Sequence, residues 1–201
     1  MQPLDSLEAV AVPMPGGDID TDQILPARFM HARRVDYGRY CFHDQRFDAR
    51  TGAPLATSVL NRPEYGQARM LVVGPNFGCG SSREQAVHTL ADFGIRVIVG
   101  TTFGDIFFVN CMKNGILPIR ADAAFVERAI GELTMSPGAA MAVDLRAQRV
   151  LAPNGAAATF EIDGFSKQAL LDGTDEIDLT LRLVAEIERY ERRRGVVLPA
   201  M

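Results

Sequence analysis

Residues 70–84 read MLVVGPNFGCGSSRE, and this stretch decides the fold of the chain. An apolar run at 70–73 leads into a glycine-rich turn, and residues 84–93 follow with apolar positions at helical spacing before Gly94. The stretch therefore predicts a strand, a tight turn and the start of a helix. A helix N-terminus offers unpaired N–H groups and partial positive charge, so a turn at this position attracts anions.

The turn presents two serines and an arginine, Ser81, Ser82 and Arg83. Arginine binds carboxylates bidentately and a serine can move a proton, so the three residues indicate chemistry on a small organic acid. A structural interpretation stands beside this one, because Ser81-x-x-Glu84 and Ser82-x-x-Gln85 both fit a helix capping box. Nucleotide-binding loops are excluded, since the third glycine of the dinucleotide fingerprint and the lysine of a phosphate-binding loop are both missing.

The pattern on either side of this stretch predicts an α/β fold. Strands are expected at 9–14, 95–99 and 116–119, with a second helix at 105–113. Strands that alternate with helices form βαβ units and a mostly parallel central sheet. Ligands bind such sheets beyond the carboxyl ends of the strands, where the serines and Arg83 lie, and this position favours the functional interpretation.

The remaining third of the chain continues with helices and short strands. A helix is expected at 123–133, three short β segments, as in a small meander, between 140 and 162, and helices at 165–171 and 177–194. The basic end of the last helix, residues 192–194, is interpreted as solvated.

Composition restricts the partners and the compartment. The 201 residues carry a net charge of -4 with a pI near 5.4, which argues against nucleic acid as a main partner. No segment approaches the roughly 20 apolar residues of a membrane span. The first 22 residues have neither the basic start nor the apolar run of a signal peptide, so a cytoplasmic protein is expected.

The cysteines and the acidic loop give no sign of a metal in this chain. Cys41, Cys79 and Cys111 are far apart and form no C-x-x-C pair, which argues against a disulfide framework, a zinc site or an iron–sulfur cluster held by this chain. We expect Cys41 and Cys111 to be buried. The three aspartates of loop 16–26 lack the EF-hand pattern, so turn and capping roles are favoured there.

The stretch 28–69 is the least regular part of the sequence. It mixes arginines with aromatic residues and contains turn signals at 48–52 and 61–66. A substrate loop, a surface for a partner and an RNA-binding segment are the three interpretations. The acidity of the whole chain makes RNA the weakest of them.

Several ordered motifs together resemble one known family. They are GDIDTDQILP at 17–26, NFGCGSSRE at 76–84, TFGDIF at 102–107, NGILPI at 114–119, and IDGF at 162–165 with LLDGTDEIDLTL at 170–181. The chain resembles, over nearly its whole length, the small subunit of 3-isopropylmalate dehydratase (isopropylmalate isomerase), the swivel domain of the aconitase superfamily. The resemblance implies a single swivel-type β/β/α domain over residues 1–201 with a C-terminal helical extension.

The resemblance also implies an activity. Members are hydro-lyase subunits that isomerise 2-isopropylmalate and 3-isopropylmalate by dehydration and rehydration in leucine biosynthesis. They are active only with a large subunit, which holds a 4Fe-4S cluster, while the small subunit has no cofactor of its own. By the family pattern Ser81 maps to the catalytic base, Ser82 and Arg83 to substrate carboxylate contacts, and Thr21 and Asp22 to a loop that faces the same cleft.

In the family, the region that corresponds to residues 28–34 recognises the variable group of the substrate. Here Phe29 and Met30 are candidates for contact with an alkyl group, and Arg28 and His31 for contact with a carboxylate. The residues do not choose among them.

Two departures from the leucine-pathway pattern leave the substrate open. That form commonly continues with His-Ala-Pro-Trp after Ser-Ser-Arg-Glu, where this chain has residues 85–88, QAVH. It also commonly reads Ser-Phe-Ala-Asp-Ile-Phe where this chain has TFGDIF at 102–107, so that Thr102 and Gly104 depart from it. The same chemistry on a methylmalate, dimethylmalate, maleate or homocitrate type of acid is therefore an alternative. A carboxylate-binding module without activity is an alternative of a different class, which would bind such acids alone and turn over none.

Overall fold

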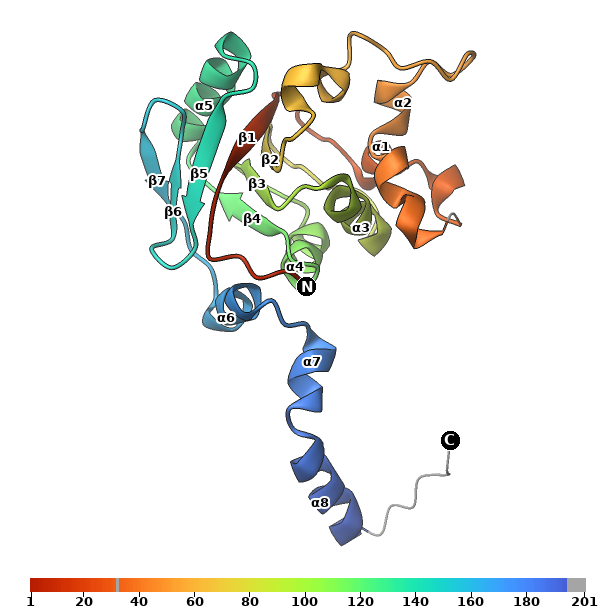
Figure 1. The fold of residues 1–201 in the computed structure, drawn as a ribbon, viewed down its shortest axis with the longest axis vertical. Helices are drawn as coiled ribbons and strands as arrows, with labels where there is room; N and C mark the ends of the chain where they lie inside the picture. The colour runs from red at the N-terminus through yellow and green to blue at the C-terminus, as the bar shows by residue number, and fades with distance from the viewer. Residues whose placement is uncertain (32, 195–201) are drawn as a thin grey trace.

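The computed structural model describes residues 1–31 and 33–194, and a seven-stranded sheet organises them. The strands lie in the order β4-β3-β2-β1-β5-β6-β7 (Figure 1). Their bounds are β1 Ser6–Met14, β2 Met70–Val73, β3 Val97–Gly100, β4 Leu117–Arg120, β5 Ala140–Asp144, β6 Arg149–Leu151 and β7 Ala157–Thr159.

Strand β1 joins a parallel and an antiparallel part of this sheet. Its second half pairs in parallel with β2, where Ala11 lies opposite Met70, and its first half pairs antiparallel with β5, where Ser6 lies opposite Asp144. Strands β2, β3 and β4 continue the parallel part, and β5, β6 and β7 form an antiparallel meander. The predicted α/β fold with a mostly parallel central sheet, and the meander that follows it, are confirmed.

The helices cover both faces of the sheet. Their bounds are α1 Thr21–Ile24, α2 His43–Arg46, α3 Glu84–Phe93, α4 Asp105–Lys113, α5 Ala123–Met135, α6 Gly164–Asp172, α7 Glu176–Leu181 and α8 Val184–Arg194, with 3-10 helices η1 Ala27–Phe29, η2 Arg34–Tyr40, η3 Val59–Asn61 and η4 Pro63–Tyr65. Both predicted helices that flank the third strand, α3 and α4, have the expected bounds. Within the described residues, no helix is long and apolar enough to cross a bilayer.

Two apolar layers sandwich the parallel strands. Leu71 and Val73 of β2 belong to the layer that contains α3, whereas Met70 and Val72 belong to the layer that contains α5. Successive side chains of a strand point to opposite faces, so a strand covered on both sides must be apolar throughout. This explains why β2 and β3 are fully buried and read as continuous apolar runs.

The irregular region 28–69 is anchored to this core. Its buried anchors are Tyr37, Cys41, Phe42, Leu60 and Tyr65. Its aromatic residues also contact one another, as in the stacked rings of Phe29 and Tyr40 at 4.1 Å. The Arg46 guanidinium lies 4.8 Å from the centre of the Phe93 ring of α3. Because Arg46 and these aromatic rings contact groups within the chain, they support the RNA interpretation less than the sequence alone does.

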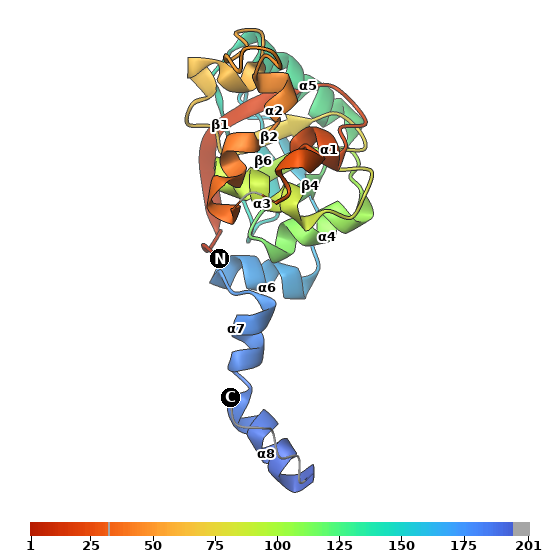
Figure 2. The ribbon, with the colours of Figure 1, turned by 90° about the vertical axis from the view of Figure 1, so that its right-hand side faces the viewer.

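Helices α7 and α8 project from the body and are called the arm below, residues 176–194 (Figures 1 and 2). One helix was predicted over 177–194, but the structure has two that meet at Arg182 and Leu183. The first begins at a capping box in which Asp175 and Asp178 exchange side-chain and backbone hydrogen bonds.

Candidate active site at the serine turn

The turn after β2, residues 76–84, is called the serine turn. It passes between the loop before α1 and the loop before α4, and forms an isolated parallel bridge with each. The N–H of Gly78 donates to the Ile19 carbonyl at 2.7 Å, and the N–H of Phe77 donates to the Thr102 carbonyl at 3.2 Å. Segments far apart in the sequence thus fix the turn at the carboxyl end of β2.

Two glycines allow the close approach of the turn to α4. Gly78 has φ +72°, and a Cβ built on it would lie 2.2 Å from the ring of Phe107, which is buried. A Cβ on Gly104 would lie 2.4 Å from the Gly78 carbonyl oxygen. The alanine that the leucine-pathway form commonly has at this position would therefore require the turn or α4 to shift. The departure at Gly104 bears directly on the position of the serine turn.

The serines do not cap the helix. Helix α3 begins at Glu84, its N-cap is Arg83, and no side chain caps it. The capping interpretation is wrong because the helix starts too late for either serine to occupy the N-cap position. Both serines are exposed, and within the described residues neither hydroxyl makes a hydrogen bond. The hydroxyls of Ser81 and Ser82 are therefore available to a ligand.

Helix α1 brings Thr21 and Asp22 to the turn. Thr21 is only 2% exposed, and its Oγ1 donates to the Ser81 carbonyl at 3.1 Å. The Asp22 carboxylate forms an ion pair with Arg83. Four of the predicted site residues, together with Ser82, are thus brought together. Thr21 supports the backbone of Ser81 here, and its contact with substrate stays a prediction.

The expected capping role of the acidic loop is confirmed for one of its aspartates. Asp20 is the N-cap of α1, and its Oδ1 accepts a hydrogen bond from the Gln23 N–H at 2.8 Å. The loop therefore uses Asp20 to start the short helix and Asp22 to hold Arg83.

Three further residues, which the sequence analysis did not single out, hold the serine turn: Asp18, Asn76 and Thr102. Asn76 has φ +58°; its N–H donates to Thr102 Oγ1 and its Nδ2 to Asp18 Oδ1, both at 2.7 Å. The signal was available in part, since Asn76 and Asp18 lie in the two motifs quoted above and asparagine tolerates a left-handed backbone. Their pairing across 58 positions is not visible in a local pattern.

Arg28 and His31 lie on a separate stretch. Arg28 forms an ion pair with Asp44, and its Nη2 lies 3.3 Å from His43 Nδ1. The hydrogen bond from Arg28 lowers the pKa of Asp44 to about 2. His31 is exposed. Across the described ranges no hydrogen bond or ion pair joins Arg28 or His31 to the serine turn, so their roles stay predictions.

The thiols behave as uncharged groups. Cys41 and Cys111 are buried, as predicted; burial raises the pKa of Cys41 to about 12 and that of Cys111 well above its ordinary value. The pKa of Cys79, in the serine turn, is raised by burial and further by Asp20 and Asp18. A neutral thiol is a poor nucleophile. Among residues 1–31 and 33–194 no group of three His, Cys, Asp or Glu side chains could hold a metal ion.

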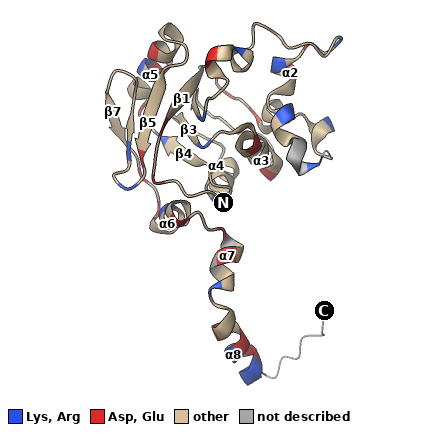
Figure 3. Ribbon diagram, in the orientation of Figure 1, with Lys and Arg blue, Asp and Glu red and all other residues tan. Residues whose placement is uncertain are grey.

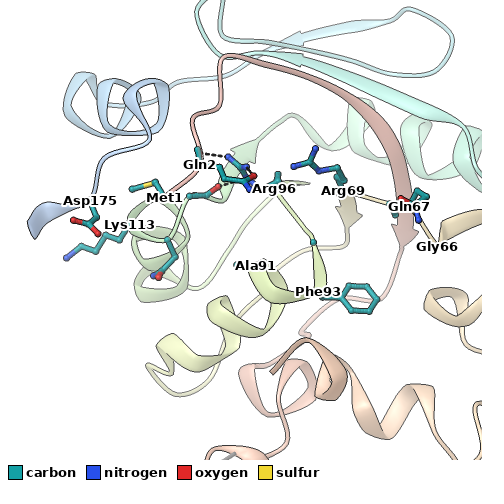
Figure 4. A pocket seen from close by; sticks show the side chains of 14 residues that line it. Met1, Gln2, Gly66, Gln67, Arg69, Ala91, Phe93, Arg96, Lys113 and Asp175 are labelled. Atoms are coloured by element: carbon teal, nitrogen blue, oxygen red, sulfur yellow. Dashed lines mark hydrogen bonds between the residues drawn. The ribbon is translucent and has the colours of Figure 1, made fainter. Parts of the chain in front are cut away.

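A pocket lies at the other end of the parallel strands. A pocket of about 710 Å³ is lined by Arg69 and Arg96, which directly precede β2 and β3 (Figure 4). The Arg96 guanidinium donates to the carbonyl oxygens of Gln2 at 2.7 Å and Gly115 at 3.0 Å. None of the predicted site residues lines this pocket. It is separate from the serine turn, which follows the opposite end of β2.

The fold and the turn define the C-terminal, swivel-type domain of the aconitase class. The Aconitase C-terminal domain family matches residues 1–124, and the LeuD_N family matches residues 131–164. The chain belongs to the family of 3-isopropylmalate dehydratase small subunits. It is 42% identical over 194 residues to the protein of that name from Rhodopseudomonas palustris strain TIE-1, with 96% of each chain covered.

Other relatives of that name cover the chain equally well. The protein from Magnetococcus marinus is 42% identical over 202 residues, covering 96% of this chain and 95% of that one, and the protein from Agrobacterium fabrum is 40% identical with 99% of each covered. A crystal structure of 3-isopropylmalate dehydratase (leuD) from Methanocaldococcus jannaschii superposes with a TM-score of 0.67. It is 24% identical and covers 92% of this chain and 99% of that one, and it supports the fold.

Proposed function

We propose that this chain supplies the serine turn to a hydro-lyase that interconverts 2-isopropylmalate and 3-isopropylmalate in leucine biosynthesis, in the cytoplasm. The observation that carries the proposal is the pair of exposed serine hydroxyls beside Arg83, at the N-terminus of α3 and unused by capping. The relatives that span nearly the whole chain are named for this dehydratase, which supports the same reaction.

Ser81 is proposed as the base. Dehydration removes a proton from one carbon and the hydroxyl group from its neighbour; rehydration returns a proton and a hydroxyl group in exchanged positions. Ser81 Oγ, as an alkoxide, takes the proton and later gives it back. A serine hydroxyl is a very weak acid, so its anion needs stabilisation. The N-terminus of α3 and the Arg83 guanidinium both favour negative charge at this point.

Ser82 and Arg83 are proposed to bind a carboxylate of the substrate. The ion pair with Asp22 orients the Arg83 side chain, which is 24% exposed and so retains access to a ligand. Thr21 fixes the Ser81 backbone, because its hydroxyl donates a hydrogen bond to the Ser81 carbonyl. Arg28 and His31 are proposed as contacts to the variable end of the substrate, with Arg28 pre-oriented by Asp44.

The other half of the site is proposed to belong to a large subunit that holds a 4Fe-4S cluster. When bound, such a cluster acts as a Lewis acid on the departing hydroxyl group. The exposure of both serines supports a partner, because a site for carbanion chemistry must exclude water and this chain alone leaves its turn open. The small-subunit identity of the family is consistent with a chain that has no cofactor of its own. We further propose that residues 1–201 form one swivel domain with a C-terminal helical extension.

The test is anaerobic reconstitution with the large subunit from the same source. The absorbance of the alkene is followed with 2-isopropylmalate, and then with methylmalate, dimethylmalate and homocitrate. Turnover of 2-isopropylmalate is expected. An assembled, cluster-loaded complex that turns over none of the four acids would contradict the enzyme proposal. Carboxylate binding by the small chain alone would then favour a binding module.

A second candidate is the same reaction on another 2-hydroxy dicarboxylic acid. It is favoured by Gly104, which lets the serine turn lie closer to α4 than an alanine would permit. Turnover of only one of the other three acids would establish it.

A further inference from the structure

The exposed apolar side chains of this protein gather along one run of helices. Within the described residues, ten large apolar side chains are exposed, and all but Met135 lie on α4, on α6 or in the arm. Single exposed apolar residues are normal on a protein surface, but a connected group of them marks a surface that another molecule covers. The distribution separates this run of helices from the rest of the protein.

The arm presents these side chains as a stripe. Ile177 and Leu181 of α7 are four residues apart and Val184 and Ile187 of α8 are three apart, so each pair lies on one face of its own helix. They are between 38% and 70% exposed, and Leu183 and Tyr190 add to the apolar surface beside them. Helix α8 has no buried residue. Helices of this length are marginal in water without a packing partner, so the arm requires one.

The apolar surface continues from the arm to the serine turn. Val109 of α4 and Phe165 of α6 line an apolar pocket of about 220 Å³ together with Asp175, where α7 begins. One turn of helix before Val109 lies Ile106, which is 55% exposed. Gly104, the N-cap of α4, lies directly against Gly78 of the serine turn. Helix α4 thus connects the serine turn to the pocket beside which the arm begins.

We propose that α4, α6 and the arm form one docking surface for the large subunit, with the arm gripping it away from the active site. This inference rests on the proposed function, which requires the large subunit to cover the serine turn. Helix α8 carries Glu186 in its first turn and ends in the basic residues 192–194, and its ribbon is coloured for both charges in Figure 3; polar groups of this kind are common at the rim of an interface.

The test uses full-length chains and measures binding separately from activity. In Leu181→Glu/Ile187→Glu two apolar anchors become charged, so the Kd for the large subunit, measured by calorimetry or sedimentation, is expected to rise about tenfold or more. The kcat at saturating small subunit is expected to stay at the wild-type value. Met135→Glu is the matched control, because Met135 is 84% exposed and lies on α5, outside the proposed docking surface. The Kd of this variant for the large subunit is expected to be unchanged.

Two results would overturn the proposal. One is wild-type affinity of the double variant for the large subunit. The other is a wild-type chain that self-associates through the arm, seen as a dimer that the double variant loses while large-subunit binding stays the same. If only the proposed function is wrong, the wild-type small chain and the large subunit bind each other but turn over no substrate. The Kd of each variant for the large subunit can then still be measured, so the two failures are distinguishable.

Discussion

The serine turn and the arm differ in how firmly the rest of the chain holds them in place. The turn is held by backbone hydrogen bonds from two other loops, and Gly78 leaves no room for a single added carbon beside Phe107. The arm leaves the side chains of its apolar stripe between 38% and 70% exposed. The difference teaches that the proposed catalytic half is preformed by this chain, whereas the arm is proposed to depend on a partner.

The largest effect on folding is expected at the turn itself. In Gly78→Ala the alanine must adopt the left-handed backbone conformation of Gly78, and its Cβ would overlap the Phe107 ring. We therefore expect a loss of about 3 kcal/mol or more in the free energy of unfolding. Urea denaturation measures it. The matched control is Gly131→Ala, where a Cβ meets nothing within 4 Å on an exposed position of α5 and should be neutral or slightly stabilising. Equal stability of the two variants would break the comparison.

A smaller effect is expected when the carboxylate grip is weakened. Arg83→Lys keeps the positive charge but loses the planar, bidentate donor, so the KM of the reconstituted enzyme should rise about 10- to 100-fold, or about 1.4 to 2.7 kcal/mol. Assembly with the large subunit should not change. Asp22→Asn serves as the companion variant, because it releases the Arg83 side chain without removing it, and a milder rise in KM is expected.

The ion pair of the separate stretch is expected to matter less. Arg28 lowers the folded-state pKa of Asp44 to about 2, below the ordinary value near 4 of an unfolded chain. The pair therefore stabilises the fold above about pH 4, and this contribution is lost as the pH falls toward 2. Both side chains are more than half exposed, so Asp44→Asn should cost less than about 1 kcal/mol at pH 7. A difference from wild type that grew on acidification would contradict this account.

The smallest effect on folding is expected in the arm. Leu181→Glu/Ile187→Glu should change the free energy of unfolding of the isolated chain by no more than about 0.5 kcal/mol, because Leu181 is 60% exposed and Ile187 38% exposed. Chemical denaturation of the isolated chain measures it. A loss of several kcal/mol would mean that the arm folds onto the body in solution, and the contrast with the serine turn would disappear.

Helix bounds and strand burial depend mainly on neighbouring residues, and local sequence patterns predicted them. The bounds of α3 follow from apolar spacing and from Gly94, which adopts φ +106° at the C-cap. The burial of β2 on both faces follows from its continuous apolar run. The capping of α3 was harder to predict than its bounds, because Ser81-x-x-Glu84 satisfies the capping pattern and only the backbone shows that Arg83 is the N-cap.

Contacts across long separations could not be predicted from the sequence. The hydrogen bond from Thr21 to Ser81 spans 60 positions and the ion pair from Asp22 to Arg83 spans 61. Both depend on how the loop before α1 crosses the carboxyl end of β2. The division of the arm into two helices at Arg182 and Leu183 was also missed, since an apolar stripe at helical spacing continues across the break.

The most direct test of the central claim compares two adjacent serines. Ser81→Ala and Ser82→Ala are each reconstituted anaerobically with cluster-loaded large subunit, and 2-isopropylmalate turnover is measured at equal amounts of assembled complex. If Ser81 is the base, its variant should lose about 10²- to 10⁴-fold or more in kcat, and Ser82→Ala should act mainly on KM. Wild-type kcat in Ser81→Ala would contradict the account.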